Sequence, residues 1–365
     1  MRHYLDANAS EPLRPAARQA MEAALDITGN PASIHGEGRA ARRVLEDARE
    51  TIAARFGARP ENLVFTSGAT EANALALHAL GQGRRIVVCA TEHDSIRAQA
   101  PDSEILPVTR DGIADLDALA AMLARAPSLV ALMLANNETG TIQPVAEAAE
   151  LCRRYGALLH VDAVQAAGRI SVSLAALGAD SMALSSHKLA GPLGAGALLF
   201  ASGAGAVRPL IAGGGQERGW RGGTPALPAI AGFAAATQHT GNAGLLRSIR
   251  DKIETAALRN GAVICGAGTE RLANTTCLAL PGVRADAQVI ALDLDGFAVS
   301  AGAACSSGKV AESHVLAAMG LGDLAGQAIR VSLPWNANPA VAAQFAQAYE
   351  SMAARLRSAL VPQAA

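Results

Sequence analysis

One lysine stands out in the sequence as a residue suited to covalent chemistry. Lys188 follows Ser-Ser-His in the stretch SMALSSHKLAGPLGAG, and lysine otherwise occurs only at Lys252 and Lys309 among 31 basic residues. The chain therefore carries nearly all of its positive charge on arginine and makes an exception here. A lysine can lose its proton and form a Schiff base with a carbonyl group, whereas a guanidinium cannot. Lys188 is therefore a candidate Schiff-base residue.

Further polar side chains stand at the ends of apolar, strand-like runs. Asp162 closes the run ALLHVD, and a buried carboxylate needs hydrogen-bond donors or a cationic partner, such as a protonated ring nitrogen. A helix N-cap or a metal pair with His160 would also explain Asp162, although no third metal ligand is evident. His93 in TEHDS and the pair Asn136 and Asn137 in ANNETG are equally compatible with structural roles.

Two stretches have the features of anion-binding segments. TSGATEANALALHAL (66–80) predicts a strand end, a glycine turn and a helix that opens near Ala69 and Thr70. The free N–H groups of such a helix terminus bind anions, but an ordinary N-cap by Ser67 or Thr70 explains the same pattern. It is not a P-loop, because no Gly-Lys-Ser/Thr follows. The glycine-rich stretch GGGQERGWRGGTPAL, which contains Thr224, is either a surface loop or a second segment that approaches an anion closely.

A cysteine and an arginine in the second half of the chain complete the candidate residues. Cys305 lies among small residues in SAGAACSSG, where it is either a reactive loop thiol or a buried structural one. Arg330, in the apolar run IRVSL, requires an anionic partner. The five cysteines are scattered, so neither a disulfide framework nor a cysteine-rich zinc site is expected, and most should be small buried residues. Together these residues include the parts needed to hold pyridoxal 5′-phosphate.

The order of apolar runs and amphipathic stretches predicts the elements that position these side chains. Strand-like runs alternate with helical patterns from about residue 62 to residue 200, which indicates βαβ units and a mostly parallel sheet. Ligands bind beyond the carboxyl ends of such strands. After a long amphipathic helix at 244–261, a smaller α+β unit follows. We therefore expect a large α/β domain over 13–245, its sheet sandwiched by helices, and a small domain formed by 1–12 with 246–365.

Composition narrows the class of protein. Half of the 365 residues are hydrophobic but only 3% are aromatic, so the core must be aliphatic, as in α/β layers. The formal charge of −1 argues against nucleic acid as a partner. The N-terminal stretch lacks the apolar centre of a signal peptide, and the most apolar region, 193–207, is too short and glycine-rich to span a membrane. We expect a cytoplasmic protein without a membrane partner.

Taken in order, these motifs resemble the cysteine desulfurases, in the class V aminotransferase branch of the fold-type I pyridoxal-phosphate enzymes. The resemblance covers nearly the whole chain, through YLDANAS, FTSGATEANALAL, TEHDSI, NNETGTIQPV, HVDAVQAAGRI, SSHKLAGPLGAGAL, GGGQERGWRGGT, SAGAACSSG and IRVSL. The joint occurrence of Ser-x-His-Lys, Asn-Asn-Glu-x-Gly and the cysteine loop is highly specific. It implies a fold-type I enzyme that removes sulfur from L-cysteine with pyridoxal 5′-phosphate as cofactor.

The resemblance also implies a role for each site residue. Lys188 would be the Schiff-base lysine and proton carrier, Cys305 the sulfur acceptor, and His93 a proton shuttle that stacks on the cofactor ring. Asp162 would pair with the ring nitrogen and Gln165 with the ring oxygen. The cofactor phosphate would be held by Ala69, Thr70, Ser185 and His187 of the same chain, together with Thr224 of the partner subunit. The substrate carboxylate would be held by Asn137 and Arg330.

The implied reaction yields L-alanine and a persulfide on Cys305, which passes its sulfur to an acceptor or scaffold protein for iron–sulfur cluster assembly or thiolation. A role for Thr224 across subunits implies a homodimer. No resident metal is expected, although the resemblance allows Cys305 to ligate a nascent iron–sulfur cluster transiently. Two alternatives stay open: a selenocysteine lyase or other pyridoxal-phosphate β-lyase or aminotransferase, and a non-catalytic partner in a sulfur-transfer complex.

Two segments depart from the family pattern. Ser10 and Glu11 stand where the family usually has Thr-Thr, and Pro334 and Trp335 replace the glycine that usually continues the stretch after Arg330. Both segments are expected near the substrate pocket, where they would alter its rim.

Overall fold

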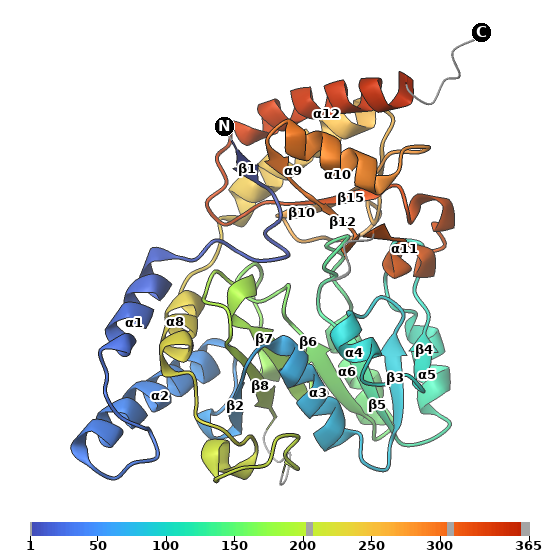
Figure 1. Cartoon of the computed structure of the whole chain (residues 1–365). Coiled ribbons are helices and arrows are strands. Elements are labelled where there is room, and N and C mark those ends of the chain that lie inside the picture. The colour runs from blue at the N-terminus through green and yellow to red at the C-terminus, as the bar shows by residue number, and fades with distance from the viewer. Residues whose placement is uncertain (1, 202–206, 305–309, 359–365) are drawn as a thin grey trace.

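The computed structural model describes residues 2–201, 207–304 and 310–358, except for the side chains of residues 303, 304, 310 and 311. A seven-stranded sheet forms the centre of its larger part, in the order β2-β8-β7-β6-β5-β3-β4 (Figure 1). Every neighbouring pair is parallel except those of β8, which is antiparallel to β2 and β7. The strands are β2 (Leu63–Thr66), β3 (Arg85–Cys89), β4 (Glu104–Leu106), β5 (Ser128–Met133), β6 (Leu158–Asp162), β7 (Ser181–Ser185) and β8 (Gly196–Phe200). The expected mostly parallel sheet is confirmed.

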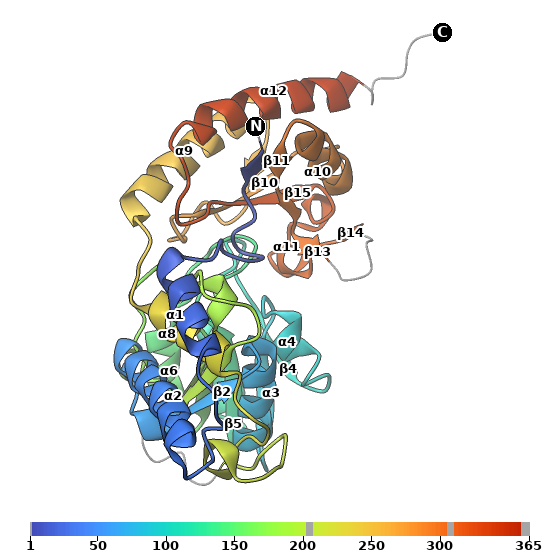
Figure 2. The same cartoon turned by 60° about the vertical axis from the view of Figure 1, so that its left-hand side comes forward.

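Helices cover both faces of this sheet, so its central strands are buried on both sides. Helices α3 and α4 lie on one face, and α2, α5, α6 and α8 lie on the other, with α1 packed outside α8 (Figure 2). The helices of this part are α1 (Pro15–Leu25), α2 (Gly36–Arg55), α3 (Ala69–Leu80), α4 (Asp94–Arg97), α5 (Leu116–Leu123), α6 (Val145–Arg154), α7 (Leu174–Leu177) and α8 (Leu227–Thr237).

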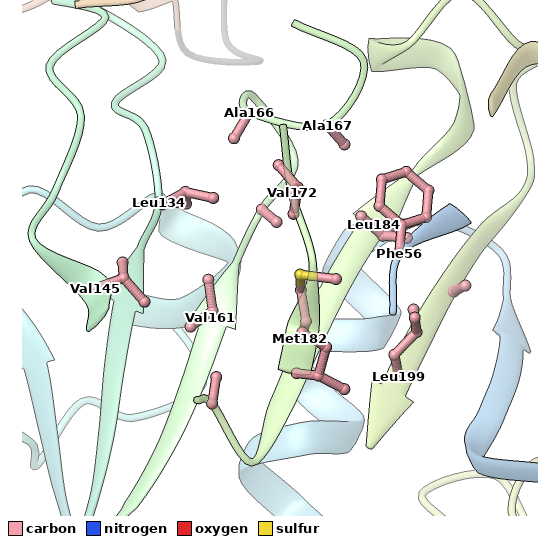
Figure 3. Close-up of a cluster of buried hydrophobic side chains, with 14 of the residues drawn as sticks. Phe56, Leu134, Val145, Val161, Ala166, Ala167, Val172, Met182, Leu184 and Leu199 are labelled. Atoms are coloured by element: carbon pink, nitrogen blue, oxygen red, sulfur yellow. The ribbon is translucent and has the colours of Figure 1, made fainter. Parts of the chain in front are cut away.

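Strand β7 shows how the aliphatic sequence fills both faces. Met182 and Leu184 point into the large core shared with Val161 and Leu199, whereas Ala183 between them packs toward α3. Figure 3 shows this core, with Phe56 closing it beside Leu184. All five residues of β7 are buried, so its end is held firmly in the interior. A rigid strand end is a precise support for the residues that follow it.

The smaller part contains a four-stranded antiparallel sheet in the order β12-β15-β10-β9. Helices α9, α10 and α12 pack above it in Figure 1. Its elements are α9 (Ala243–Arg259), β9 (Val263–Ile264), β10 (Thr275–Ala279), α10 (Ala285–Leu294), β11 (Phe297–Ala298), β12 (Ser300–Ala301), β13 (Ala303–Ala304), β14 (Val310–Ala311), α11 (His314–Ala318), β15 (Ala328–Ser332) and α12 (Val341–Ser358).

The N-terminal segment joins the two parts. Strand β1 (His3–Tyr4) pairs with β11, and Asp6 forms a bridge with Ser332 of β15. Beyond it, Glu11 N donates to the carbonyl of His187 in the larger part. This course is consistent with grouping residues 1–12 with 246–365, and the domain boundaries themselves stay a prediction.

Several local expectations can be compared directly. Helix α2 begins at Gly36, where the His35 side chain accepts a hydrogen bond from Gly38 N and caps the helix. The expectation of buried thiols is confirmed for Cys89, Cys152, Cys265 and Cys277. Over the parts of the chain that the structure describes, no helix combines the length and apolar character needed to cross a bilayer.

Candidate active site

The polar residues predicted at strand ends gather at one edge of the large sheet. Asp162 ends β6 and pairs in register with Ala183 of the neighbouring β7, which Lys188 follows three residues after the strand ends. His93 follows β3, and Asn137 follows β5. Because β3, β5, β6 and β7 are parallel, their carboxyl ends meet at the same edge. These four residues therefore lie at the sheet edge where the sequence predicted a site.

The amine of Lys188 is largely buried. Its Nζ donates to the backbone carbonyl of Asn8 at 2.6 Å. Burial, together with the positive charges of Arg330 and Arg169, lowers the pKa of this lysine to about 8. A substantial fraction of Lys188 is then neutral near physiological pH, which is the form that attacks a carbonyl or takes up a proton.

The carboxylate of Asp162 is held by donors in the protein interior. Its Oδ2 accepts from Asn73 Nδ2 at 2.8 Å, and its Oδ1 accepts from the backbone N–H of Val164 at 3.0 Å. Asn73 is completely buried in α3. With these two donors, Asp162 keeps a fixed orientation and retains acceptor capacity for a further cation or N–H group.

His160, two residues earlier on β6, does not serve as a metal ligand beside Asp162. Its Nε2 lies 3.0 Å from Asn73 Oδ1, and its Nδ1 lies 2.8 Å from Ser181 Oγ. Burial lowers its pKa to about 3, so it is a neutral structural side chain that supports Asn73. Among the described residues no group of three or more metal-ligating side chains is present.

His93 is connected to the same network through Ser95. Its Nδ1 accepts from the backbone N–H of Ser95 at 3.0 Å, as the N-cap of α4. The Ser95 hydroxyl in turn lies within hydrogen-bond distance of both His93 Nδ1 and Asn73 Nδ2. Since Nδ1 is an acceptor, neutral His93 carries its proton on Nε2. The ring therefore offers an N–H group away from the helix it caps.

Arg330, on β15 of the smaller part, contacts Asn137 of the larger part, which follows β5. Arg330 Nη2 donates to Asp6 Oδ1 at 2.6 Å, which supplies the anionic partner that the sequence required. Its Nη1 donates to the backbone carbonyl of Asn137 at 3.1 Å. The Nε atom of Arg330 is buried and has no hydrogen-bond partner among the residues that the structure describes. A guanidinium with an unused buried donor is well suited to bind a carboxylate.

The N-terminus of α3 approaches the sheet closely, next to the end of β7. Gly196 of β8 lies opposite both Thr66 and Ser185, and a Cβ atom at position 196 would lie 2.7 Å from the backbone of Gly68. Only glycine leaves room for this approach. Ala69 is the first helical residue and Gly68 the N-cap. The free N–H groups of this terminus are therefore placed beside Ser185 by the packing of the backbone.

The other expected phosphate contacts lie around this terminus. Thr224 lines a pocket of about 430 Å³ together with Ser67, Gly194 and Arg221 of the same chain, a volume that includes space open to solvent. Thr70, like Ser67, is exposed at the start of α3. His187 follows Ser185 in a short helical turn, and burial together with the charge of Lys188 lowers its pKa to about 4. A neutral His187 offers a donor without adding charge.

Residues on both sides of the cysteine segment are anchored to the large sheet. Ser313 Oγ donates to the buried Glu138 Oε2 at 2.6 Å, and a Cβ on Gly302 would lie only 2.3 Å from the same oxygen. Burial raises the pKa of Glu138. His314 Nε2 lies 2.9 Å from the carbonyl of Glu92. Cys305 and Lys309 themselves lie outside the described residues.

Several residues of the site were not identified from the sequence. Asn8 supplies the carbonyl that Lys188 contacts, and Asn73 holds Asp162. Arg169 contacts Gln165, as described below. Glu92 is fully buried next to the Asp162 charge, and burial raises its pKa well above the usual range. Asn73 could have been noticed as a polar residue in the otherwise apolar helical stretch ANALAL, but backbone contacts such as that of Asn8 leave no signal in side-chain types.

Comparison with known proteins places this chain in a family. The model of the class-V aminotransferases matches residues 3–340. A cysteine desulfurase from Cereibacter sphaeroides is 42% identical over 336 residues, which cover 87% of each chain. The solved structure of a NifS-like protein from Rickettsia africae superimposes with a TM-score of 0.90 at 32% identity, covering 96% of this chain and 99% of that one. A protein named SspA, solved in complex with cysteine, has a TM-score of 0.80 at 27% identity and covers 92% and 99%.

The matched length and the identity are both well beyond what a shared fold alone would give. The chain belongs to the class-V aminotransferase family and, within it, to the cysteine desulfurases.

Proposed function

We propose that this protein is a pyridoxal-phosphate-dependent cysteine desulfurase, which removes sulfur from L-cysteine and passes it to Cys305. The observation that carries the proposal is the placement of a largely buried Lys188, with a pKa of about 8, at the sheet edge where Asp162 is held by Asn73. This edge belongs to a chain whose relatives are cysteine desulfurases. A lysine and a carboxylate with these properties are what a pyridoxal cofactor requires from a protein.

The residues present fit this cofactor. Asp162 retains acceptor capacity for a ring N–H, Lys188 is desolvated enough to react as an amine, and the open N-terminus of α3 offers donors to a phosphate. When bound, pyridoxal phosphate supplies an electron sink for the electrons left behind as the substrate loses its α-proton. The residues that would hold it are Lys188, Asp162, Gln165, His93, Ala69, Thr70, Ser185, His187 and, from a second copy of the chain, Thr224 of the partner subunit.

The substrate carboxylate is assigned to Arg330 and Asn137. The buried Nε of Arg330, which no described residue contacts by a hydrogen bond, provides a directed donor, and Asp6 fixes the other end of its guanidinium. The neutral amine of Lys188 is the base that takes the α-proton, because its pKa of about 8 leaves part of it unprotonated at neutral pH. The N–H of His93 provides a second position from which a proton can be moved.

Cys305 is assigned as the sulfur acceptor. Its thiolate forms an S–S bond with the substrate sulfur while the substrate C–S bond breaks, and that bond's electron pair goes to the substrate carbon, which is then protonated. The products are L-alanine and a Cys305 persulfide, whose outer sulfur passes to an acceptor or scaffold protein for iron–sulfur cluster assembly or thiolation. We further infer a homodimer, the domain division at residues 12–13 and 245–246, and a cytoplasmic location.

The experiment that tests this proposal measures alanine and sulfide formed from L-cysteine under anaerobic, reducing conditions. Wild type is expected to form both in equal amounts. Cys305→Ala should lose both while keeping the yellow colour that borohydride bleaches at Lys188. The matched control Cys152→Ala, which removes a buried thiol in α6, should behave as wild type.

Other outcomes point to other functions. Pyruvate in place of alanine, or sulfide release that persists in Cys305→Ala, would contradict the persulfide route and identify a β-lyase on the same scaffold. Absence of a colour that borohydride bleaches would leave a non-catalytic partner in sulfur transfer as the better description. A higher kcat/KM for selenocysteine than for cysteine would identify a selenocysteine lyase.

A further inference from the structure

The two segments that depart from the family pattern meet in space. Trp335 N donates to Glu11 Oε2 at 3.2 Å, and its indole Nε1 donates to the carbonyl of Pro12 at 2.8 Å. Glu11 lies in the N-terminal segment and Trp335 in the loop between β15 and α12, 324 residues away. Two departures that contact each other directly are more simply explained as one structural unit than as two independent changes.

Glu11 also forms an ion pair in the interior. Its Oε1 lies 3.3 Å from Arg169 Nη2, and the side chains of Glu11 and Arg169 are only 6% and 8% exposed. Burial raises the pKa of Glu11 and lowers that of Arg169, while each charge opposes the shift of the other. A buried pair of this kind is maintained only where further hydrogen bonds satisfy both partners. The N–H of Trp335 is one of these bonds, and the carbonyl of Ala7, 3.3 Å from Arg169 Nη2, is another.

Arg169 then fixes the orientation of Gln165. Its Nη1 donates to the Gln165 backbone carbonyl at 3.0 Å and also to the side-chain Oε1. A guanidinium has donors only, so the oxygen of the Gln165 amide must face Arg169 and the nitrogen must face away from it. That nitrogen donates to the carbonyl of Asn8 at 3.0 Å, the same oxygen that accepts from Lys188.

We propose that Glu11, Arg169 and Trp335 form a buried positioning unit that holds the Gln165 amide with its nitrogen as a donor next to Lys188. None of the three is a catalytic residue, because the unit acts only through Gln165 and the backbone of residues 7 and 8. The inference rests on the proposed function in one respect: the Gln165 donor is assigned to the ring oxygen of the cofactor.

The unit also supplies a matched control. Arg14 places its guanidinium 4.3 Å from the centre of the Trp335 ring, and it lines the same pocket as Glu11 and Arg169. No hydrogen bond joins Arg14 to Gln165 in the described part of the chain. Replacing Arg14 therefore removes a nearby guanidinium without removing the bond from Arg169 that orients the Gln165 amide.

The experiment compares holoenzyme variants by the visible absorption band of bound pyridoxal phosphate, at one fixed pH, and by the dissociation constant of the cofactor. Arg169→Met and Gln165→Leu should shift the band in the same direction and weaken retention by about tenfold, the usual effect of losing one directed hydrogen bond. The double variant Gln165→Leu/Arg169→Met should retain the cofactor no less tightly than the single variant with the poorer retention, because both changes remove the same interaction. Arg14→Met, which loses the contact with the Trp335 ring and a charge effect on Glu11 but no bond to Gln165, should shift the band and the dissociation constant far less than Arg169→Met.

Folding is checked separately. If Arg169→Met does not fold, because Glu11 is left buried without its partner, Glu11→Gln/Arg169→Met removes both charges and carries the same test. A wild-type band in folded Arg169→Met, additive effects of the two single changes, or an equal shift in Arg14→Met would each overturn the positioning role. A wild type that binds no cofactor would instead overturn the proposed function, and this inference with it.

Discussion

Lys188→Met is expected to stabilise the cofactor-free protein at pH 7. The fall in the pKa of Lys188 from 10.5 to about 8 means that holding the charged amine in the fold costs about 3 kcal/mol. Its replacement removes that cost and loses one hydrogen bond to Asn8, worth about 1 kcal/mol. The Asn8 carbonyl keeps its bond from Gln165, so no acceptor is left unpaired. The net gain in the free energy of unfolding should be about 2 kcal/mol.

The gain should disappear as the pH rises. Between pH 8 and 10.5 the unfolded chain keeps a proton on Lys188 that the folded chain has lost, so the stability of the wild type increases with pH in this window. At pH 7 Lys188 is mostly protonated in both states, so nearly the full cost is present. Above pH 10.5 both are neutral and no cost remains. The difference in the free energy of unfolding between Lys188→Met and wild type should therefore be largest at pH 7 and should disappear by about pH 10.

The assay is urea unfolding of cofactor-free wild type, Lys188→Met and the control Lys252→Met, each at several pH values from 7 to 10. Lys252 is exposed on α9, so its replacement should have little effect at any pH. A Lys188→Met protein that is less stable than wild type at pH 7 would refute the reasoning. A stabilisation that does not depend on pH would also refute it, because it would come from packing rather than from the buried charge.

Three further changes test other contacts. Arg49→Met leaves the carboxylate of Glu217 buried without its guanidinium and should lower the free energy of unfolding by about 3–5 kcal/mol in urea titrations. Gly302→Ala places a Cβ 2.3 Å from Glu138 Oε2 and should slow persulfide formation while the cofactor absorption band stays unchanged. Asn73→Leu removes a donor from the carboxylate that ends β6 and should weaken cofactor retention by about tenfold in a titration.

Much of the fold could be predicted because it depends on patterns that are local in the sequence. The alternation of buried strands such as β5 and β7 with amphipathic helices fixes a parallel sheet and the edge where ligands bind. The need of Arg330 for an anion, and of Asp162 for donors, followed from the cost of burying a charge. The structure identifies the partners as Asp6 and Asn73.

What could not be predicted are contacts between residues that are distant in the chain or made by the backbone. Nothing in the composition of the N-terminal segment indicates that Glu11 meets Trp335, because their contact depends on how two loops cross. The carbonyl of Asn8 beside Lys188 is equally hidden, since every residue carries such a group. The sequence around Cys305 predicts a reactive thiol, and its role stays a prediction.

The acceptor that Lys188 contacts has a consequence for how the chain tolerates mutation. A carbonyl of the main chain is present whichever amino acid occupies position 8, so no substitution there can delete it. The Asn8 side chain, by contrast, ties this segment down through bonds to the Asn137 carbonyl and to Thr275 Oγ1. A scan of all substitutions at position 8 should therefore rank amino acids by how well they anchor the segment, not by whether their side chains can accept a hydrogen bond from an amine.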